Sequence, residues 1–366
     1  MKIMFLVRSL HVGGAERQLV AVANGLATKG YDVAVAQYYS GGSLEHDLVN
    51  VQLIDLKKTG RWDILGFCQR LISSVRLFGP DVMYSFLGTS NIIAATLKPF
   101  WKNTRVVWSV RASDMDYSHY DRLARFSNWL EARLARFADG IIANSRAGIA
   151  HAIGRGMNRE IMTVVPNGID TDCFRLNKEG VSSLRQQWKV AENEVLVGLV
   201  ARIDPMKDHE TFLRAVRIVA DADSHVRFVC VGGGEHAFVE KVRTLSEELG
   251  LGDFLTWAGE LDYMNPAYNA LDICCLSSMT EGFPNVVGEA MSCGVPCVVT
   301  DVGDAAFIVG ETGLVAPRRD PEALSVAILQ MVALVRTGDF ANPRKRIVDE
   351  FSLEQMVLKS EQALQA

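Results

Sequence analysis

The sequence predicts an α/β protein made of two Rossmann-like, doubly wound domains, residues 1–170 and 171–348, followed by a helix at 349–366. Three observations support this. The 366 residues exceed what one ordinary core holds. Short β-branched runs alternate with longer helical patterns, as in parallel sheets covered by helices on both faces. The alternation stops at a turn cluster, Pro166 to Asp170, and starts again at Val195.

In the first domain, apolar runs without polar alternation predict buried strands, and amphipathic stretches predict the helices between them. The predicted strands are 2–7, 31–36, 51–54, 81–85, 105–110, 139–143 and 161–165. The predicted helices are 15–28, 63–77, 89–98 and 118–137. Right-handed crossovers then give a doubly wound parallel sheet.

The second domain repeats this alternation without a close sequence repeat. Its predicted strands are 195–200, 226–231, 254–257, 273–276, 296–300 and 313–315, and its predicted helices are 207–221, 235–249, 285–293 and 320–336. Ligands bind at the carboxyl ends of strands in such folds, so we expect a ligand cleft between the two domains. The last helix is expected to pack back on the first domain, although no pattern in the sequence fixes its place.

Composition excludes several classes of protein. A hydrophobic fraction of 49% with 22% charged residues is globular, and a net charge of −5 argues against a nucleic-acid partner. The first apolar run ends at Arg8, far short of the roughly 20 residues of a membrane span, and no signal peptide is expected. Most of the seven cysteines lie in apolar segments, which predicts reduced core thiols and a cytoplasmic protein.

The strongest motif runs from Glu281 to Met291, after the predicted strand 273–276. Pro284 suits the first position of a helix, because its missing N–H would be unpaired there. Gly294 ends that helix. The backbone N–H groups of Asn285, Val286 and Val287 then form an anion site supported by the helix dipole.

Two carboxylates flank this anion site. Glu281 precedes the helix, where it can accept hydrogen bonds from sugar hydroxyls, and Glu289 lies inside the helix, where it can hold a ribose diol. For either residue taken alone, an ordinary charge on an exposed helix or loop is the favoured interpretation. Two cations, Arg202 and Lys207, follow the strand 195–200 on a loop that opens the next helix, and both residue types bind phosphate.

Together these motifs resemble glycosyltransferase family 4, retaining enzymes of the GT-B fold. The family signature is a pair of glutamates separated by seven residues, here Glu281 and Glu289, within a Glu-Gly-Phe-Pro-Asn frame that contributes Phe283 and Pro284. The resemblance implies that Arg202 and Lys207 hold the diphosphate of a nucleotide-sugar donor, with no metal and no cofactor.

Two glycine loops extend the resemblance. Gly13 and Gly14 follow the first strand, and Gly232 to Gly234 follow the strand 226–231. In the family such loops approach the ligand, so Gly14 and Gly233 are candidate donor contacts. A plain strand-to-helix turn explains Gly232 to Gly234 equally well, whereas the position of Gly13 and Gly14 after the first strand favours a ligand contact over a tight turn.

The sequence departs from the family at the end of the strand 105–110. Many relatives carry a histidine there, and this chain carries Arg111. Arg111 and His119 are both candidate contacts to the acceptor or the transferred sugar, and the sequence does not decide between them.

The resulting hypothesis is a retaining, metal-independent hexosyltransferase that moves a sugar from a UDP-sugar, or alternatively a GDP-sugar, to a glycan or lipid-linked glycan in surface polysaccharide synthesis. The alternatives are a nucleotide-sugar epimerase of the same fold, a non-catalytic nucleotide-sugar-binding protein, and a metal-dependent transferase. The last would use an Asp-x-Asp pair, of which the chain has three: Asp114/Asp116, Asp170/Asp172 and Asp221/Asp223.

The predicted helix 118–137 allows two interpretations. Its arginines are Arg122, Arg125, Arg133 and Arg136, and its large apolar residues are Leu123, Phe126, Trp129, Leu130, Leu134 and Phe137. Basic residues beside aromatic ones suit a helix that docks on anionic lipid at the inner face of the cell membrane. A buried apolar stripe is the simpler interpretation and the favoured one.

Overall fold

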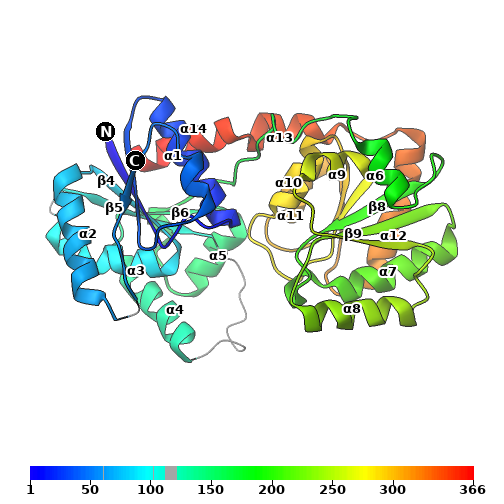
Figure 1. Ribbon diagram of the computed structural model, residues 1–366, viewed down its shortest axis with the longest axis horizontal. Coiled ribbons are helices and arrows are strands. Elements are labelled where there is room, and N and C mark those ends of the chain that lie inside the picture. The colour runs from blue at the N-terminus through cyan, green and yellow to red at the C-terminus, as the bar shows by residue number, and fades with distance from the viewer. Residues whose placement is uncertain (61, 102, 112–121) are drawn as a thin grey trace. The chain divides into compact units, whose positions relative to one another are not determined.

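The computed structural model describes residues 1–60, 62–101, 103–111 and 122–366. These residues form two compact units, one of Met1–Gly168 with Leu353–Ala366 and the other of Ile169–Ser352. Each unit is an open parallel sheet covered by helices on both faces (Figure 1). The predicted α/β class with two Rossmann-like domains is therefore confirmed.

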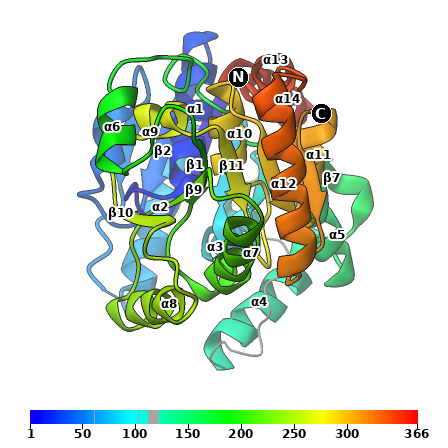
Figure 2. The same ribbon diagram turned by 90° about the vertical axis from the view of Figure 1, so that its right-hand side faces the viewer.

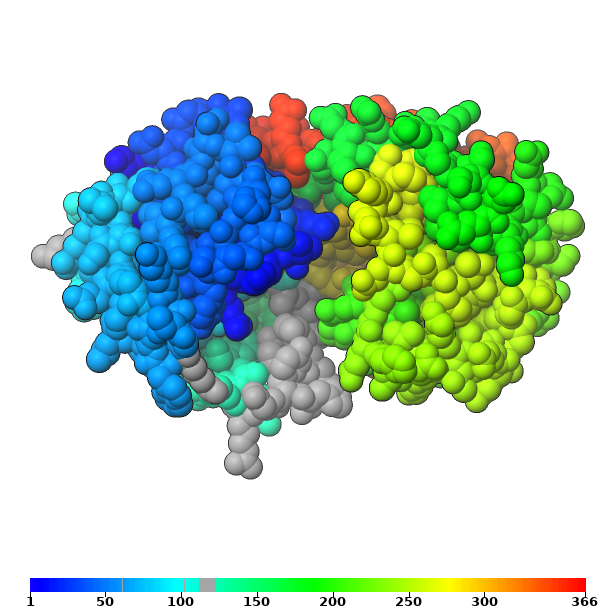
Figure 3. Space-filling model, in the orientation of Figure 1, coloured from blue at the N-terminus to red at the C-terminus, as the bar shows by residue number. Residues whose placement is uncertain are grey.

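The first unit contains a seven-stranded sheet in the order β3-β2-β1-β4-β5-β6-β7, with every neighbouring pair parallel. Its strands are β1 Lys2–Val7, β2 Asp32–Gln37, β3 Gln52–Asp55, β4 Val82–Phe86, β5 Arg105–Val110, β6 Gly140–Ala143 and β7 Met162–Val164. Its α-helices are α1 Gly14–Thr28, α2 Ile64–Phe78, α3 Leu87–Leu97, α4 Arg122–Leu134, α5 Arg146–Gly154 and α14 Leu353–Gln365. Short 3-10 turns add η1 Ser43–Asp47, η2 Lys98–Phe100, η4 Ala135–Phe137 and η5 Arg159–Ile161. The face of this unit that Figure 3 shows is formed mainly by its blue and cyan segments.

The second unit contains a six-stranded parallel sheet in the order β10-β9-β8-β11-β12-β13. Its strands are β8 Val195–Val200, β9 Val226–Val231, β10 Leu255–Gly259, β11 Ile273–Leu276, β12 Cys297–Thr300 and β13 Leu314–Ala316. Its α-helices are α6 Val181–Gln187, α7 His209–Ala222, α8 His236–Glu248, α9 Met264–Ala270, α10 Asn285–Ser292, α11 Ala305–Val309, α12 Pro321–Thr337 and α13 Pro343–Phe351, with 3-10 turns at η6 Pro205–Lys207 and η7 Gly310–Thr312. Helices α7 and α12 pack on each other on one face (Figure 2).

Alternate residues of each strand enter cores on opposite faces of the sheets. In β1, Met4 packs in one core and Phe5 in the core on the other face. In β8, Leu196 and Val197 divide in the same way. Because both faces are buried, the strands are apolar throughout, which is why the sequence predicted them so clearly. Each of the thirteen predicted strands is present, with its ends shifted by at most two residues.

The C-terminal segment differs from the predicted single helix. It contains two helices that meet at Ser352: α13 belongs to the second unit, whereas α14 packs beside α1 in the first. Val357 and Leu364 of α14 enter the same core as Leu19 of α1. No helix in the described part of the chain has both the length and the apolar character needed to cross a bilayer.

Candidate functional site

The candidate site is built at the point where the strand order of the second sheet reverses. Strand β8 lies between β9 and β11, so the loops that follow β8 and β11 leave the sheet side by side on its carboxyl edge. This is the position at which open α/β sheets bind ligands. The backbone of Met279 donates to the carbonyl of Met206 at 2.8 Å, and the Ser277 hydroxyl donates to the carbonyl of Lys207 at 2.9 Å. The two loops therefore hold each other in place.

Lys207 and Glu281 meet between these loops. The Lys207 ammonium donates to Glu281 Oε1 at 2.6 Å, and the Ser278 hydroxyl donates to the same oxygen at 2.7 Å. The side chains of Lys207 and Glu281 are 24% and 12% exposed. A cation and a carboxylate predicted from motifs 74 residues apart thus form one part-buried, charge-assisted pair. No motif in the sequence pointed to Ser278, because its contact with Glu281 depends on the path of the loop.

The loop of Glu281 is fixed from the other side by the segment after β12. Asp304 donates its backbone N–H to the carbonyl of Gly282 at 2.9 Å. Gly303 has a φ of +55°, and a Cβ on it would lie 2.2 Å from the carbonyl oxygen of Glu281. Only glycine permits this approach, so Gly303 positions the carboxylate through the backbone.

Arg202 lies on the same loop as Lys207, nearer the end of β8. Its side chain is 67% exposed, and its guanidinium approaches Asp204 at 3.3 Å. Asp204 is the N-cap of η6 and also accepts the backbone N–H of Met206. An exposed cation held by one flexible ion pair can turn to an anionic ligand at little cost.

The helix after Glu281 begins where the range 285–293 predicted, but Pro284 does not occupy its first position. Pro284 is the N-cap of α10, and Asn285 is its first residue. The prediction of three outward N–H groups was also wrong in one position, because Val287 donates to the carbonyl of Pro284 at 3.1 Å. Asn285 and Val286 occupy the first two helical positions, where N–H groups point out of the helix. Gly294 follows the helix with a φ of +87°, as expected of its end.

Phe283 and Glu289 have structural partners that the sequence did not reveal. The Phe283 ring is 6% exposed and packs against Phe351 with ring centroids 5.7 Å apart, so its side chain belongs to the core. Glu289 is half-buried and accepts the hydroxyl of Tyr268 at 2.6 Å. Burial and the neighbouring Glu289 carboxylate raise the pKa of Tyr268 well above its usual value, so Tyr268 stays a donor. No local pattern in the sequence points to Tyr268, because α9 and α10 meet only in the folded chain.

The two glycine loops have different surroundings. A Cβ on Gly232 would lie 2.0 Å from the carbonyl oxygen of Ala201. A Cβ on Gly234 would lie 2.2 Å from the carbonyl oxygen of Ile203. Gly233 accepts the backbone N–H of Ile203 at 2.7 Å. This loop therefore packs directly on the loop that carries Arg202. Gly14 belongs to the first unit, where it is exposed and begins α1 after β1.

Arg111 lies at the carboxyl end of β5 in the first unit. Its guanidinium donates to the Ser109 hydroxyl and to the Asn167 side chain, both at 2.7 Å, and stacks 4.8 Å from the Phe86 ring centroid. The side chain is therefore held in one orientation at the edge where ligands bind. His119 lies outside the described residues.

The Asp-x-Asp pairs have other partners where the structure describes them. The first pair lies outside the described residues. Asp170 accepts two backbone N–H groups of its own turn. In the third pair, Asp221 and Asp223 bind Arg217 and Arg336 respectively. Within the described ranges, no group of three or more His, Cys, Asp or Glu side chains is arranged to hold a metal ion.

Comparisons with known proteins agree with the motifs. A family model described as Glycosyltransferase Family 4 matches residues 12–173, and one described as Glycosyl transferases group 1 matches residues 194–333. The chain is 29% identical over 217 residues to the GDP-mannose-dependent α-(1-6)-phosphatidylinositol monomannoside mannosyltransferase of Mycobacterium tuberculosis, covering 54% of each protein. It is 28% identical over 210 residues to the D-inositol 3-phosphate glycosyltransferase of Segniliparus rotundus, covering 56% of this chain and 46% of that one. The chain thus spans about half the length of the curated relatives it matches.

Solved structures match over the whole chain. Anabaena Alr3699/HepE in complex with UDP superposes with a TM-score of 0.84 at 22% identity, covering 100% of both chains. The sucrose-phosphate synthase of Thermosynechococcus elongatus superposes with a TM-score of 0.81 at 21% identity, covering 99% of this chain and 98% of that one. At these identities the likeness shows the fold, which is GT-B. With its two matched domains and this fold, the chain belongs to glycosyltransferase family 4.

Proposed function

We propose that the chain is a retaining, metal-independent hexosyltransferase that uses a nucleotide-diphosphate sugar. The carrying observation is the Lys207–Glu281 pair beside the start of α10, at the reversal point of the second sheet. The second unit, proposed as residues 171–348, binds the donor, and the first, residues 1–170, binds the acceptor. The C-terminal helix, residues 349–366, packs on the first.

In this proposal the donor diphosphate lies against Arg202, Lys207 and the first N–H groups of α10 at Asn285 and Val286. These groups stabilise the charge that develops on the leaving phosphate, in the place where other transferases use a metal. Glu281 orients the transferred sugar, and Glu289, held by Tyr268, binds the ribose diol. The backbones of Gly233, Phe283 and Pro284 line the donor, and Gly14 is proposed as a further donor contact.

The proposed reaction is a same-face displacement. The bond between the anomeric carbon and the phosphate oxygen breaks, and the acceptor oxygen bonds to that carbon on the same face. The acceptor proton goes to the leaving phosphate oxygen. Glu281 is bound by Lys207 and Ser278, which suits an orienting carboxylate better than a covalent nucleophile. Arg111, fixed by Ser109 and Asn167, is proposed to contact the acceptor or the sugar.

The proposed donor is a UDP-sugar, with a GDP-sugar as the alternative. Alr3699/HepE was solved with UDP-glucose, whereas the mycobacterial relative is named for GDP-mannose. The proposed acceptor is a glycan or lipid-linked glycan of surface polysaccharide synthesis, and the relatives' names include a phosphatidylinositol mannoside.

We also propose that the protein is cytoplasmic and docks peripherally on the membrane through the α4–η4 segment. The predicted buried apolar stripe holds for Leu134, which packs against the core of the first unit. It does not hold for Leu123, Phe126 and Trp129, which are each more than half exposed, or for Phe137, which is 43% exposed. Phe126 stacks on Trp129, and Arg133 lies over the same indole, 5.5 Å from its centroid. Aromatic and basic side chains sharing one exposed helix face suit an anionic bilayer surface.

Thermal unfolding with a panel of nucleoside diphosphates and their sugars tests donor binding, because a ligand at 100 times its Kd adds ~2.7 kcal/mol. Incubation of the stabilising donor with candidate acceptors, followed by analysis of the anomeric configuration, tests transfer and retention. Activity that disappears with excess chelator would refute metal independence. Isomerised donor without acceptor would instead mark an epimerase, and tight binding without turnover a binding protein.

A further inference from the structure

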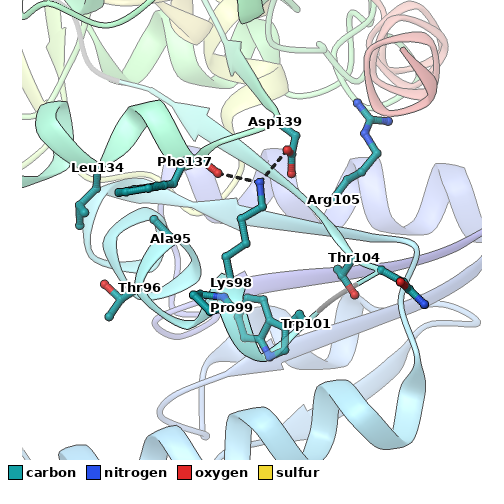
Figure 4. A pocket seen from close by; sticks show the side chains of 11 residues that line it. Ala95, Thr96, Lys98, Pro99, Trp101, Thr104, Arg105, Leu134, Phe137 and Asp139 are labelled. Carbon is teal, nitrogen blue, oxygen red and sulfur yellow. Dashed lines mark hydrogen bonds and ion pairs between the residues drawn. The ribbon is translucent and has the colours of Figure 1, made fainter.

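A pocket of about 690 Å³ lies in the first unit at the amino end of the sheet, the edge opposite the carboxyl ends of the strands (Figure 4). It is formed where β5 begins at Arg105 and where Asp139 precedes β6. The lining comes from the end of α3, η2, the start of β5 and the end of α4 with η4: Ala95, Thr96, Lys98, Pro99, Trp101, Asn103, Thr104, Arg105, Leu134, Phe137 and Asp139. Its volume is that of a typical small-molecule site.

The lining of the pocket is largely apolar. Ala95, Pro99, Trp101, Leu134 and Phe137 supply the apolar surface. Trp101 is 4% exposed, and its indole N–H has no acceptor among the described residues. The indole nitrogen has almost no accessible surface of its own, so Trp101 contributes the apolar part of its ring to the lining.

The charged groups at the pocket favour an anionic amphiphile over a sugar. Lys98 donates to Asp139 at 2.6 Å and to the carbonyl of Phe137 at 2.9 Å, so these two charges satisfy each other. Arg105 donates to the carbonyl of Leu364 at 3.0 Å and leaves the pocket with one net positive charge. A sugar needs many hydrogen-bond partners, and few of these polar groups remain for it.

The pocket is continuous with the exposed face of α4–η4. Phe137 belongs to both, and Arg136 stacks on its ring at 4.8 Å from the centroid. Phe100, in the 3-10 turn that supplies Lys98 and Pro99, is 53% exposed. A bilayer in contact with the aromatic face of α4 would therefore also be in contact with the mouth of the pocket.

We propose that this pocket takes one acyl chain of an anionic phospholipid from the bilayer on which α4 docks. The chain fills the apolar lining, and the net positive charge of Lys98, Arg105 and Asp139 attracts the lipid's anion. The inference rests on the proposed membrane docking and is independent of the sugar-transfer chemistry. It adds to surface docking a single lipid bound at a defined place.

Quenching of tryptophan fluorescence by bromine tests the proposal. The first probe is a bromine-tipped dodecanoate, used as a monomer below its micelle concentration, and the second is vesicles of phosphatidylglycerol brominated in its acyl chains. The variants are Trp101→Phe, Trp129→Phe and Thr96→Phe, the last adding a ring at an exposed position of the pocket lining. Ser73→Phe adds the same ring at an exposed position of α2 away from the pocket and is the matched control.

We expect both probes to quench wild type and Ser73→Phe equally, and most of the dodecanoate quenching to disappear in Trp101→Phe and Thr96→Phe. Shortening the dodecanoate to decanoate should weaken its binding about 15-fold, since each buried CH₂ contributes about fourfold. Vesicle binding measured by sedimentation should fall in Trp129→Phe while dodecanoate quenching remains.

Three results would overturn the proposal. Dodecanoate quenching that persists in both Trp101→Phe and Thr96→Phe would mean that the chain binds elsewhere. Quenching by dodecanoate without quenching of Trp101 by vesicles would make the pocket a site for free fatty acids. Vesicle binding without Trp101 quenching by either probe would leave the membrane docking intact and remove the pocket's role.

Discussion

Replacing Lys207 by methionine removes the ammonium group at the centre of the candidate site and keeps most of the length of the side chain. In the native chain this group donates to Glu281 Oε1 at 2.6 Å, with only 24% of the side chain exposed. The substitution removes the proposed cation for the leaving phosphate. It also leaves the Glu281 carboxylate with the Ser278 hydroxyl in place of a full positive charge.

The substitution should lower both the rate of sugar transfer and the free energy of unfolding. Loss of one preorganised group that stabilises developing negative charge costs about 3–4 kcal/mol of transition-state stabilisation, or ~10²–10³ in kcat. Loss of a charge-assisted hydrogen bond in a partly exposed pair lowers the free energy of unfolding by about 1–2 kcal/mol. The variant should therefore be almost inactive and still folded. We expect Glu281→Ala to have the same two consequences, because it removes the other half of the pair.

The measurements are kcat and KM for sugar transfer with the donor found by the nucleotide panel, and thermal unfolding of each variant. Arg336→Met is the matched control: it breaks an ion pair with Asp223 at the far end of α7, with side chains 41% and 19% exposed. Its turnover should equal that of wild type, whereas its stability should fall slightly. Turnover of Lys207→Met within a few-fold of wild type would refute the assignment of the site.

Three further predictions concern the surroundings of this pair. Tyr268→Phe removes the hydroxyl that donates to Glu289. We expect the KM for the donor to rise about 5- to 30-fold with kcat nearly unchanged, as for the loss of a charge-assisted bond of ~1–2 kcal/mol. An unchanged KM would mean that Glu289 does not bind the donor. Burial, and then the neighbouring Lys207, lower the pKa of His209 to about 4 in the folded chain. The unfolded chain therefore binds this proton at a higher pH, and the free energy of unfolding should fall by up to ~3 kcal/mol as the pH drops from about 6.5 towards 4. His209→Gln should flatten this dependence, measured by urea unfolding at a series of pH values. Gly303→Ala should lower both stability and transfer, because its Cβ would meet the carbonyl oxygens of the loop that carries Glu281. Gly338 is the matched control: it has a φ of +70° and open space around it, so Gly338→Ala should cost only the ~1–2 kcal/mol of a left-handed backbone and leave transfer unchanged.

The sequence predicted the elements of both sheets because each strand is buried on both faces. A run such as Val195–Val200 is apolar throughout and is followed by a helical pattern, so its type and position can be read locally. Short helices such as α9 and α11 were not predicted, because five to seven residues carry too little hydrophobic periodicity to be recognised.

The motifs located the candidate site, because carboxyl ends of parallel strands meet at one edge whatever the detailed packing. Arg202, Lys207 and Glu281 could therefore be named before the order of the strands was known. The sequence could not say that β8 and β11 are neighbours, and it is this adjacency that joins Lys207 to Glu281 at 2.6 Å.

Only the tertiary structure decided which side chains face a core and which face solvent. Phe283 and Phe126 are both aromatic residues within apolar patterns, yet Phe283 packs on Phe351 and Phe126 is more than half exposed. The return of α14 to the first unit and the contact of Tyr268 with Glu289 were likewise beyond the sequence. Local periodicity determines how a segment folds, whereas its partners depend on contacts between segments far apart in the chain, which no local pattern encodes.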